Sequence, residues 1–422
     1  MNASRVRQGA DRYDVVVVGA RVAGASTALL LARAGLKVAL LDRSAAGSDT
    51  LSTHALMRAG VLQLFRWGLL ERVVAAGTPP VRQVRFHYAD AASAHVSIRP
   101  SPGVDALYAP RRHVLDQILA DAAAEAGVDV RYGTAVSGLL RDGRGRVTGV
   151  RTSAARSRGG VRAAPLAPSE LTAAITVGAD GIRSLVARDA GAPVVHQGRS
   201  AGAVLYRYLA GLPGDRYDWA YGPHAAAGLI PTNAGQTCAF VSTTPARMRA
   251  LRRDGAEAAF HGLLATAAPG LVDQVRAAEP VGRIRGWAGA PGFVRRPSGP
   301  GWALVGDAGY YKDPITTHGM TDALRDAELV TDEIVEALAG GTSEAFALGR
   351  YQATRDRLSR GLLDATEEVA GYAWDTAAVQ ALLRRVSSAM SDELEHLQAL
   401  PRHDVGAGIA AFVPPDSAET RS

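Results

Sequence analysis

The chain has 422 residues, of which 47% are hydrophobic and 21% charged, and this ordinary globular composition excludes collagen, coiled coil and extensive disorder. The single cysteine, Cys238, excludes an intramolecular disulfide and favours a reducing, cytoplasmic location. The formal net charge is +6, but the arginines are spread along the chain rather than clustered, so we predict no nucleic-acid binding. No apolar run near the N-terminus reaches the roughly 20 residues that a membrane span needs, so we predict no membrane span.

The N-terminal pattern predicts a βαβ unit of about 30 residues. A short β-branched run over residues 14–18 is typical of a buried strand, an alanine- and leucine-rich helix is expected over residues 23–34, and a second strand over residues 37–41.

The remaining pattern predicts an α/β fold in which a β-rich stretch interrupts the first domain and a helical segment ends the chain. The β-rich stretch covers residues 201–294, with helices near residues 246–278, and most of the chain beyond residue 320 is helical. The other expected elements are helices at 55–76 and 111–126 and strands at 81–98, 128–132, 146–152, 174–177 and 302–305.

A glycine motif lies where the first strand turns into the first helix. Residues 19–24 read Gly-Ala-Arg-Val-Ala-Gly, and Asp42 follows at the end of the second strand. The outer glycines allow a tight turn and close helix packing, the helix N-terminus attracts a pyrophosphate, and the aspartate suits ribose hydroxyls. Arg21 replaces the usual middle glycine, so a plain packing turn stays an alternative. The dinucleotide-site residues predicted here are Gly19, Ala20, Arg21, Ala23, Gly24, Asp42 and Arg43.

Two later motifs place an aspartate at the carboxyl end of a strand, where open α/β sheets bind ligands. Asp180 and Gly181 follow one expected strand, and the segment Gly306-Asp307-Ala308 follows another. Taken singly, each motif is more typical of a tight turn capped by Asp than of a binding site.

In this order, the three motifs resemble those of the FAD-dependent monooxygenases of the para-hydroxybenzoate hydroxylase type. The resemblance covers roughly residues 14–338. The positions that match the family's pattern beyond the three motifs are Pro314, Gly319, Met320, Asp326 and Ala327, together with Arg112, Leu115 and Leu119 of an Arg-x-x-Leu helix.

The resemblance implies a Rossmann-like FAD-binding domain with an inserted β-sheet substrate domain. The FAD-binding domain would comprise residues 12–80, 103–195 and 296–340; the substrate domain, residues 81–102 and 196–295; and a C-terminal helical region, residues 341–422. By resemblance, Asp42 would hold the adenosine ribose, Arg112 the phosphate and ribityl side, and Asp307 a ribityl hydroxyl. Asp180 and Gly181 would lie near the pyrophosphate. The loop from Pro314 to Gly319 would pass beside the flavin ring, and a helix starting near Met320 would point its positive end at the N1–C2=O edge.

Two histidines are candidate catalytic residues. His54, in the loop after the second strand, could accept a proton from a phenolic substrate, although an exposed histidine beside a helix cap is the alternative. His318 is expected within reach of the cofactor. Lys312 is predicted to be a solvated loop lysine, with contact to flavin or substrate as the alternative. The ten histidines are scattered, so no metal site is predicted.

The resemblance implies an FAD-dependent monooxygenase that uses NAD(P)H and O2 on a hydrophobic or aromatic substrate, a hydroxylase or epoxidase of bacterial secondary metabolism, acting as a monomer or homodimer. A geranylgeranyl reductase-type enzyme is the nearest alternative, followed by a flavin-dependent halogenase and a non-catalytic GDP-dissociation inhibitor. Aromatic residues of the β-rich stretch would form either core or pocket: Tyr206, Tyr208, Trp219, Tyr221, Phe240, Trp287 and Phe293.

Overall fold

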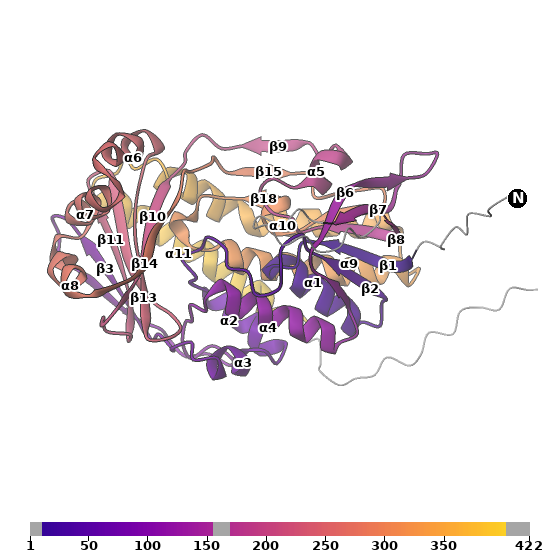
Figure 1. Ribbon diagram of the computed structural model, residues 1–422, viewed down its shortest axis with the longest axis horizontal. Helices are drawn as coiled ribbons and strands as arrows, with labels where there is room; N and C mark the ends of the chain where they lie inside the picture. Colours follow the sequence, from indigo (N-terminus) through magenta and orange to yellow (C-terminus); the bar gives the residue numbers. More distant parts are fainter. Residues whose placement is uncertain (1–10, 155–168, 402–422) are drawn as a thin grey trace, which may run out of the picture.

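The structure is a computed structural model that describes residues 11–154 and 169–401. Figure 1 shows a sheet toward each end of the molecule, with two long helices, α10 (Glu344–Val369) and α11 (Thr376–Ala399), between them. The part of the expected C-terminal helical region at residues 402–422 lies outside the described residues.

The larger sheet is eight-stranded and supplies the parallel core of the fold. Its order is β16-β17-β8-β1-β2-β5, and the β6–β7 hairpin attaches to β8. β1 lies parallel to β2 and β8, and β17 lies parallel to β8, so the carboxyl ends of these strands meet at one edge. The strands are β1 (Asp11–Val18), β2 (Val38–Leu41), β5 (Asp129–Arg131), β6 (Thr134–Arg141), β7 (Val147–Ala154), β8 (Ser169–Gly178), β16 (Ser298–Gly299) and β17 (Trp302–Leu304).

Both faces of this sheet are covered, one by helices and the other by the β6–β7 hairpin together with α5, which explains why β1 is a continuous apolar run rather than an alternating one. Val15 and Val17 pack against the helices of one face, and Val16 packs into a separate cluster on the other. On the first face α1 packs between α4 and α9. The helices of this part are α1 (Val22–Arg33), α2 (Arg58–Arg66), α3 (Leu70–Ala75), α4 (Arg112–Glu125), α5 (Leu185–Ala190) and α9 (Gly319–Leu338).

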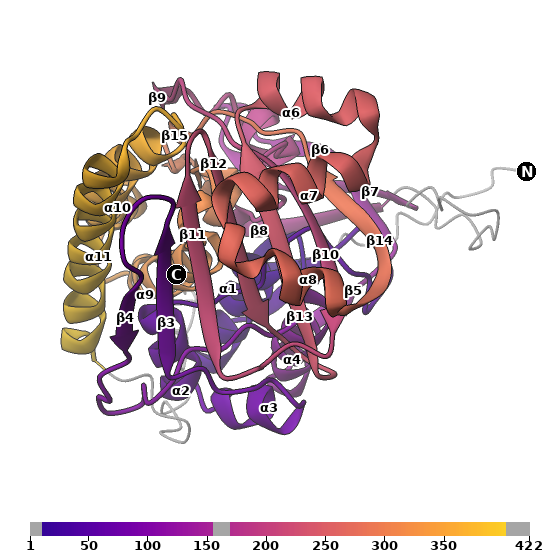
Figure 2. The ribbon, with the colours of Figure 1, turned by 90° about the vertical axis from the view of Figure 1, so that its left-hand side faces the viewer.

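The second sheet is seven-stranded, with the order β14-β10-β13-β12-β11-β3-β4. Three short helices pack on its outer face, as Figure 2 shows, and an aromatic cluster covers its inner face. Of the seven aromatic residues predicted to form core or pocket, all but Phe293 lie in or against this cluster. The elements are β3 (Gln83–Tyr88), β4 (Ala94–Ser97), β10 (Ala203–Ala210), β11 (Arg216–Gly222), β12 (Ala225–Pro231), β13 (Gln236–Thr243), β14 (Glu279–Trp287), α6 (Pro245–Leu251), α7 (Ala256–Ala267) and α8 (Val272–Ala277).

A small third sheet, β18-β15-β9, joins the two parts of the molecule. β18 lies in the loop that runs from β17 to α9, and this loop positions the candidate site. Its strands are β9 (Val194–Gln197), β15 (Phe293–Arg295) and β18 (Tyr310–Tyr311), and the short 3₁₀ turns of the chain are η1 (Arg252–Asp254), η2 (Pro269–Leu271), η3 (Gly306–Ala308) and η4 (Pro314–Thr316).

Two local features add to what the sequence predicted. The helical pattern expected over residues 55–76 is present as two helices, because Gly68, with a φ of 71°, ends α2 in the left-handed conformation. β6 was not expected, because Ser137 and Gly138 in its middle weaken the strand pattern. In the stretches that the structure describes, no helix is both long and apolar enough to cross a membrane.

Candidate functional site

The turn between β1 and α1 brings the helix end close to the strand. A Cβ atom at Gly24 would lie 1.7 Å from the carbonyl oxygen of Gly19, and one at Gly19 would lie 2.5 Å from that of Ala179. Gly19 also has a φ of 106°, which disfavours other residues. No side chain caps the N-terminus of α1, so its first amides are open to an anionic ligand.

Asp42 lies at the carboxyl end of β2, directly beside this turn. Its Oδ2 accepts the Ala20 N–H at 2.8 Å, and its Oδ1 accepts the Ser44 N–H at 2.7 Å. Arg43 is exposed, and a cofactor-binding role for it stays a prediction. Asp42 borders a small hollow of about 10 Å³ that is lined by Ala20, Arg21, Ser44, Ala45, Gly47, Ser48, Asp116, Gln117 and Tyr132.

Arg21, which stands at the position of the usual second glycine, spans this hollow. Its Nη1 donates to the backbone oxygen of Ser48 at 2.5 Å and to Asp116 at 3.0 Å. Arg112 binds the same carboxylate, with Nε 3.1 Å from Asp116 Oδ1. Two guanidinium groups, those of Arg21 and Arg112, therefore share the Asp116 carboxylate where the resemblance places the phosphates.

Asp180 has a local structural role in the described structure. Its carboxylate accepts the Ser184 hydroxyl at 2.5 Å and the Leu185 N–H at 2.6 Å, so it caps α5. Burial raises the pKa of Asp180, and these hydrogen bonds oppose that shift. Gly181 has a φ of 79° and open space beside it. A cofactor-binding role for these two residues stays a prediction.

Asp307 follows β17 and faces the start of α9. Its side chain is exposed to solvent, yet protein surrounds it closely enough that desolvation raises its pKa to about 6, against the opposing charges of Lys312 and Arg112. Gly319, the first residue of α9, is also exposed, and a Cβ there would lie 4.0 Å from Asp307 Oδ1. Asp307 thus stands in a recess at the N-terminus of α9, and the half-buried Pro314 and Met320 lie on the same loop and helix end.

A network of buried charges lies behind this recess. The Lys312 side chain is buried and ion-paired with Asp322, so the prediction of a solvated loop lysine is wrong. Burial and the neighbouring Arg325 lower the pKa of Lys312 to about 7. The reason for the error is that the partners of Lys312 lie on α9, which the local sequence of the loop does not show.

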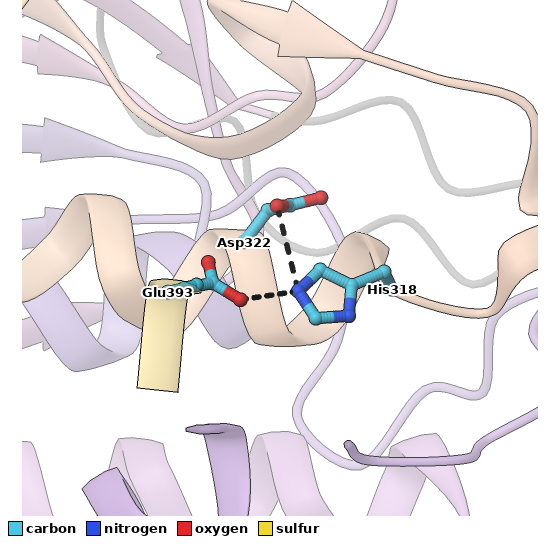
Figure 3. Close-up of side chains that lie close together, drawn as sticks. All are labelled: His318, Asp322 and Glu393. Carbon is cyan, nitrogen blue, oxygen red and sulfur yellow. Dashed lines mark hydrogen bonds and ion pairs between the residues drawn. The ribbon is translucent and has the colours of Figure 1, made fainter. Parts of the chain in front are cut away.

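His318 is part of the same network. Its Nε2 lies 2.5 Å from Glu393 Oε2 and 3.9 Å from Asp322 Oδ1, as Figure 3 shows, and the residue is 1% exposed. Burial lowers the pKa of His318, although the Glu393 carboxylate opposes this shift. His318, Asp322 and Glu393 could in principle hold a metal ion, since their ligand atoms lie within 4.8 Å of one another. Arg325 and Lys312 already neutralise both carboxylates, however, which favours an ion-pair network.

Arg325 occupies the centre of this network and is fully buried. It donates to Asp322 at 3.0 Å, to Asp326 at 2.7 Å and to Glu393 at 2.9 Å. Asp326 also accepts the N–H of Gly306 at 3.1 Å and so joins the network to the turn that carries Asp307. The sequence analysis did not identify Arg325 or Glu393 as site residues.

His54 lies outside the buried charge network, against the aromatic inner face of the second sheet. It is completely buried rather than exposed, its Nε2 is 2.5 Å from the Tyr208 hydroxyl, and its φ of 72° is unusual for a residue other than glycine. Burial, followed by the charges of Arg111 and Arg112, lowers the pKa of His54 to about 3. His54 is therefore neutral at pH 7, and its buried Nδ1 has no hydrogen-bond partner.

The His54–Tyr208 pair continues into a string of polar groups along β10 and β14. Arg111 stacks on the Tyr208 ring at 3.6 Å from its centroid. The Tyr206 hydroxyl lies beside Arg285, without the geometry of a hydrogen bond. The Tyr311 hydroxyl and the Trp287 indole N–H also lie beside each other without the geometry of a hydrogen bond. Polar atoms that are buried but unpaired in this way are available to a bound molecule.

Acidification should reveal the neutral state of His54. The unfolded chain protonates this histidine near its ordinary pKa of 6.5, whereas the folded protein resists protonation down to about pH 3. Stability is therefore lost as pH falls below 6.5, by about 1.4 kcal/mol per unit, or about 2 kcal/mol at pH 5. His54→Asn removes the titrating group and tolerates the positive φ. We expect the melting temperature of the wild type to drop more between pH 7.5 and 5 than that of the variant; equal drops would contradict this assignment.

The described residues fit an FAD molecule. The turn at Gly19 and Gly24 is so close that a Cβ at either glycine would overlap neighbouring backbone, and it forms a cradle at the uncapped N-terminus of α1. Asp42 stands beside this cradle, and the recess at Asp307 lies at the same sheet edge.

Comparisons with known proteins agree with this geometry. A family model described as "FAD binding domain" matches residues 12–366. Digeranylgeranylglycerophospholipid reductase 1 of Methanopyrus kandleri is 28% identical over 369 residues, which cover 85% of this chain and 90% of that protein. Aklavinone 12-hydroxylase DnrF of Streptomyces peucetius is 27% identical over 387 residues, which cover 85% and 74% of the two chains.

Among solved structures, PqsL of Pseudomonas aeruginosa, described as "a probable FAD-dependent monooxygenase", superposes with a TM-score of 0.73 and 20% identity. The match covers 90% of this chain and 100% of that one. At this identity the similarity concerns the fold alone. The predicted fold class, an FAD-binding α/β domain combined with further sheets and C-terminal helices, is confirmed.

Proposed function

The chain belongs to the FAD binding domain family, and from this premise we propose that it is an FAD-dependent monooxygenase acting on a hydrophobic or aromatic substrate. The observation that carries the proposal is the juxtaposition of the Asp307 recess with loops that reach the aromatic inner face of the second sheet. Ile315, from the loop after Asp307, and Ala55, next to His54, both pack into that aromatic cluster. A flavin held at Asp307 would therefore lie beside an aromatic surface that suits an apolar, planar molecule.

Two groups of residues would bind the two ends of the cofactor. Asp42 and the amides at the start of α1 would hold the adenosine half, with Arg21 and Arg112 near the phosphates. Asp307 would accept a ribityl hydroxyl, and the N-terminus of α9 would face the pyrimidine edge of the ring. A helix N-terminus stabilises negative charge by about 1 kcal/mol or more in a dry site, which favours the reduced anion.

When bound, FAD supplies the redox chemistry by passing two electrons from NAD(P)H to O2. In the balanced reaction, NAD(P)H, a proton, O2 and the substrate yield NAD(P)+, water and the substrate with one oxygen atom added. The aromatic face and the helices α10 and α11 would exclude water. The neutral His54 can orient a substrate hydroxyl by a hydrogen bond, either through its unpaired Nδ1 or through the Tyr208 hydroxyl, whereas its lowered pKa makes it a weak proton acceptor.

The second candidate is a reductase of carbon–carbon double bonds. It is favoured by the coverage of the Methanopyrus kandleri reductase, 90% of whose length aligns with this chain. The many tyrosine and tryptophan side chains of the inner face argue for an aromatic substrate rather than a polyprenyl chain, because stacked rings complement flat molecules. A flavin-dependent halogenase shares the fold but is not favoured by any contact described here.

Oxygen reactivity separates the two candidates. The FAD-loaded protein is reduced anaerobically with NADH or NADPH, mixed with oxygenated buffer and followed by stopped-flow absorbance. A monooxygenase is expected to show a transient species, distinct from oxidised and reduced flavin, before the oxidised spectrum returns. Monophasic reoxidation without such a species, in the presence and absence of aromatic test compounds, would favour the reductase, as would anaerobic oxidation of the reduced protein by a geranylgeranyl lipid.

A further inference from the structure

Helix α11 contacts the loop that leads into α9, although α11 lies beyond the residues that the family model matches. The family match ends at residue 366, whereas α11 spans Thr376–Ala399. From this helix Glu393, 2% exposed, places Oε2 at 2.5 Å from His318 Nε2 and Oε1 at 2.9 Å from Arg325 Nη1. A C-terminal helix therefore supplies a buried carboxylate to the residue that directly precedes α9.

Glu393 contacts His318 at the point where the loop after β18 becomes helix α9. His318 directly precedes Gly319, the exposed first residue of α9 that lies beside Asp307. Its Nδ1 is buried without a hydrogen-bond partner, so the ring is oriented through Nε2 alone, by Glu393 and the more distant Asp322. The direction of the side chain at the start of α9 thus depends on a group supplied by α11.

Glu393 is ionised at neutral pH. Burial disfavours its charged form, but His318, Arg325 and Lys312 together lower its pKa to about 2. The carboxylate consequently contributes a full negative charge behind the recess at Asp307. A negative charge there opposes the stabilisation that the helix N-terminus, Lys312 and Arg325 would give to an anion in the recess.

We propose that Glu393 is a positioning residue for the flavin: it fixes His318 and with it the start of α9, and its charge moderates the electron affinity of the bound cofactor. The inference rests on the proposed FAD site. It assigns to α11 two separable effects, one of geometry on FAD binding and one of charge on FAD reduction.

Two substitutions separate these effects, and a third is a matched control. Glu393→Gln keeps the length of the side chain and can still accept the N–H of His318, but it removes the charge. Glu393→Asp keeps the charge and withdraws the carboxylate by one methylene. Glu395→Gln makes the same chemical change as the first variant two residues away on the exposed side of α11. The readouts are the FAD dissociation constant and the midpoint potential of bound FAD.

For Glu393→Gln we expect the ratio of reduced to oxidised FAD at a fixed potential to rise about tenfold, which is the size of effect that one buried charge exerts. This corresponds to about 30 mV upward for a two-electron couple. For Glu393→Asp we expect FAD binding about tenfold weaker, with a smaller change in potential. Glu395→Gln should match the wild type in both readouts.

Potentials and affinities of both Glu393 variants that match those of Glu395→Gln would overturn the proposal. If Glu393→Gln does not fold, Glu393→Asp decides, and wild-type FAD affinity in that variant overturns the proposal. Absence of FAD binding by the wild type would be a different result, because it would reject the proposed function itself.

Discussion

Replacing Arg325 with methionine is expected to destabilise the protein by about 3–5 kcal/mol, the range seen when one partner of a buried ion pair is removed. Arg325 is fully buried and pairs with Asp322, Asp326 and Glu393. Methionine has a similar length but no charge, so it leaves three buried carboxylates with Lys312 and His318 as their remaining partners. Thermal or urea unfolding measures the loss.

Arg350→Met is the matched control. Arg350 also pairs with two acids, Glu333 and Glu336, but on the surface of the protein. Surface ion pairs add little to stability because water already screens them. The control should therefore unfold close to the wild type. An Arg325→Met protein as stable as this control would show that the buried network does not hold α9 and α11 together.

The second large effect is expected from Asp42→Ala, which should weaken FAD binding about 100-fold. Hydrogen bonds to a charged acceptor contribute about 1.5–3 kcal/mol each, and the ribose would lose one or two of them. The variant also releases the Ala20 N–H that Asp42 holds at the start of the cradle.

Asp14→Ala provides the comparison for this variant. Asp14 likewise accepts a backbone N–H, that of Lys37, at 2.7 Å, but it lies at the opposite end of the β1–β2 pair. Flavin fluorescence titration gives both affinities. Equal FAD binding by the two variants would contradict the assignment of Asp42 to the ribose.

The sequence predicts those parts of the site whose causes are local. The βαβ unit was predictable because the strand, the two glycines and Asp42 lie within one short stretch, and each has a direct steric or hydrogen-bonding reason. The order of the three motifs along the chain predicted the fold class through its resemblance to a known family, and the structure places the carboxyl ends of the strands concerned at one sheet edge.

The parts that were not predicted depend on residues far apart in the chain. His54 and Tyr208 are separated by 154 positions, and no local pattern shows that one covers the other. Lys312 was expected in solvent because its loop is polar, and its burial follows from partners on α9. One signal was available: His318, Asp322 and Arg325 are spaced to share one helix face. Nothing in the sequence near Glu393 points to that face.

The measurement that tests the account most directly is a titration of the flavin-free wild-type protein with FAD and, in parallel, with FMN, followed by flavin fluorescence. We expect one FAD per chain and much weaker FMN binding, because Asp42 and Asp307 would hold opposite ends of a single dinucleotide. Equal affinities would show that the adenosine half makes no contribution at Asp42, and no binding of either flavin would contradict the proposed site as a whole.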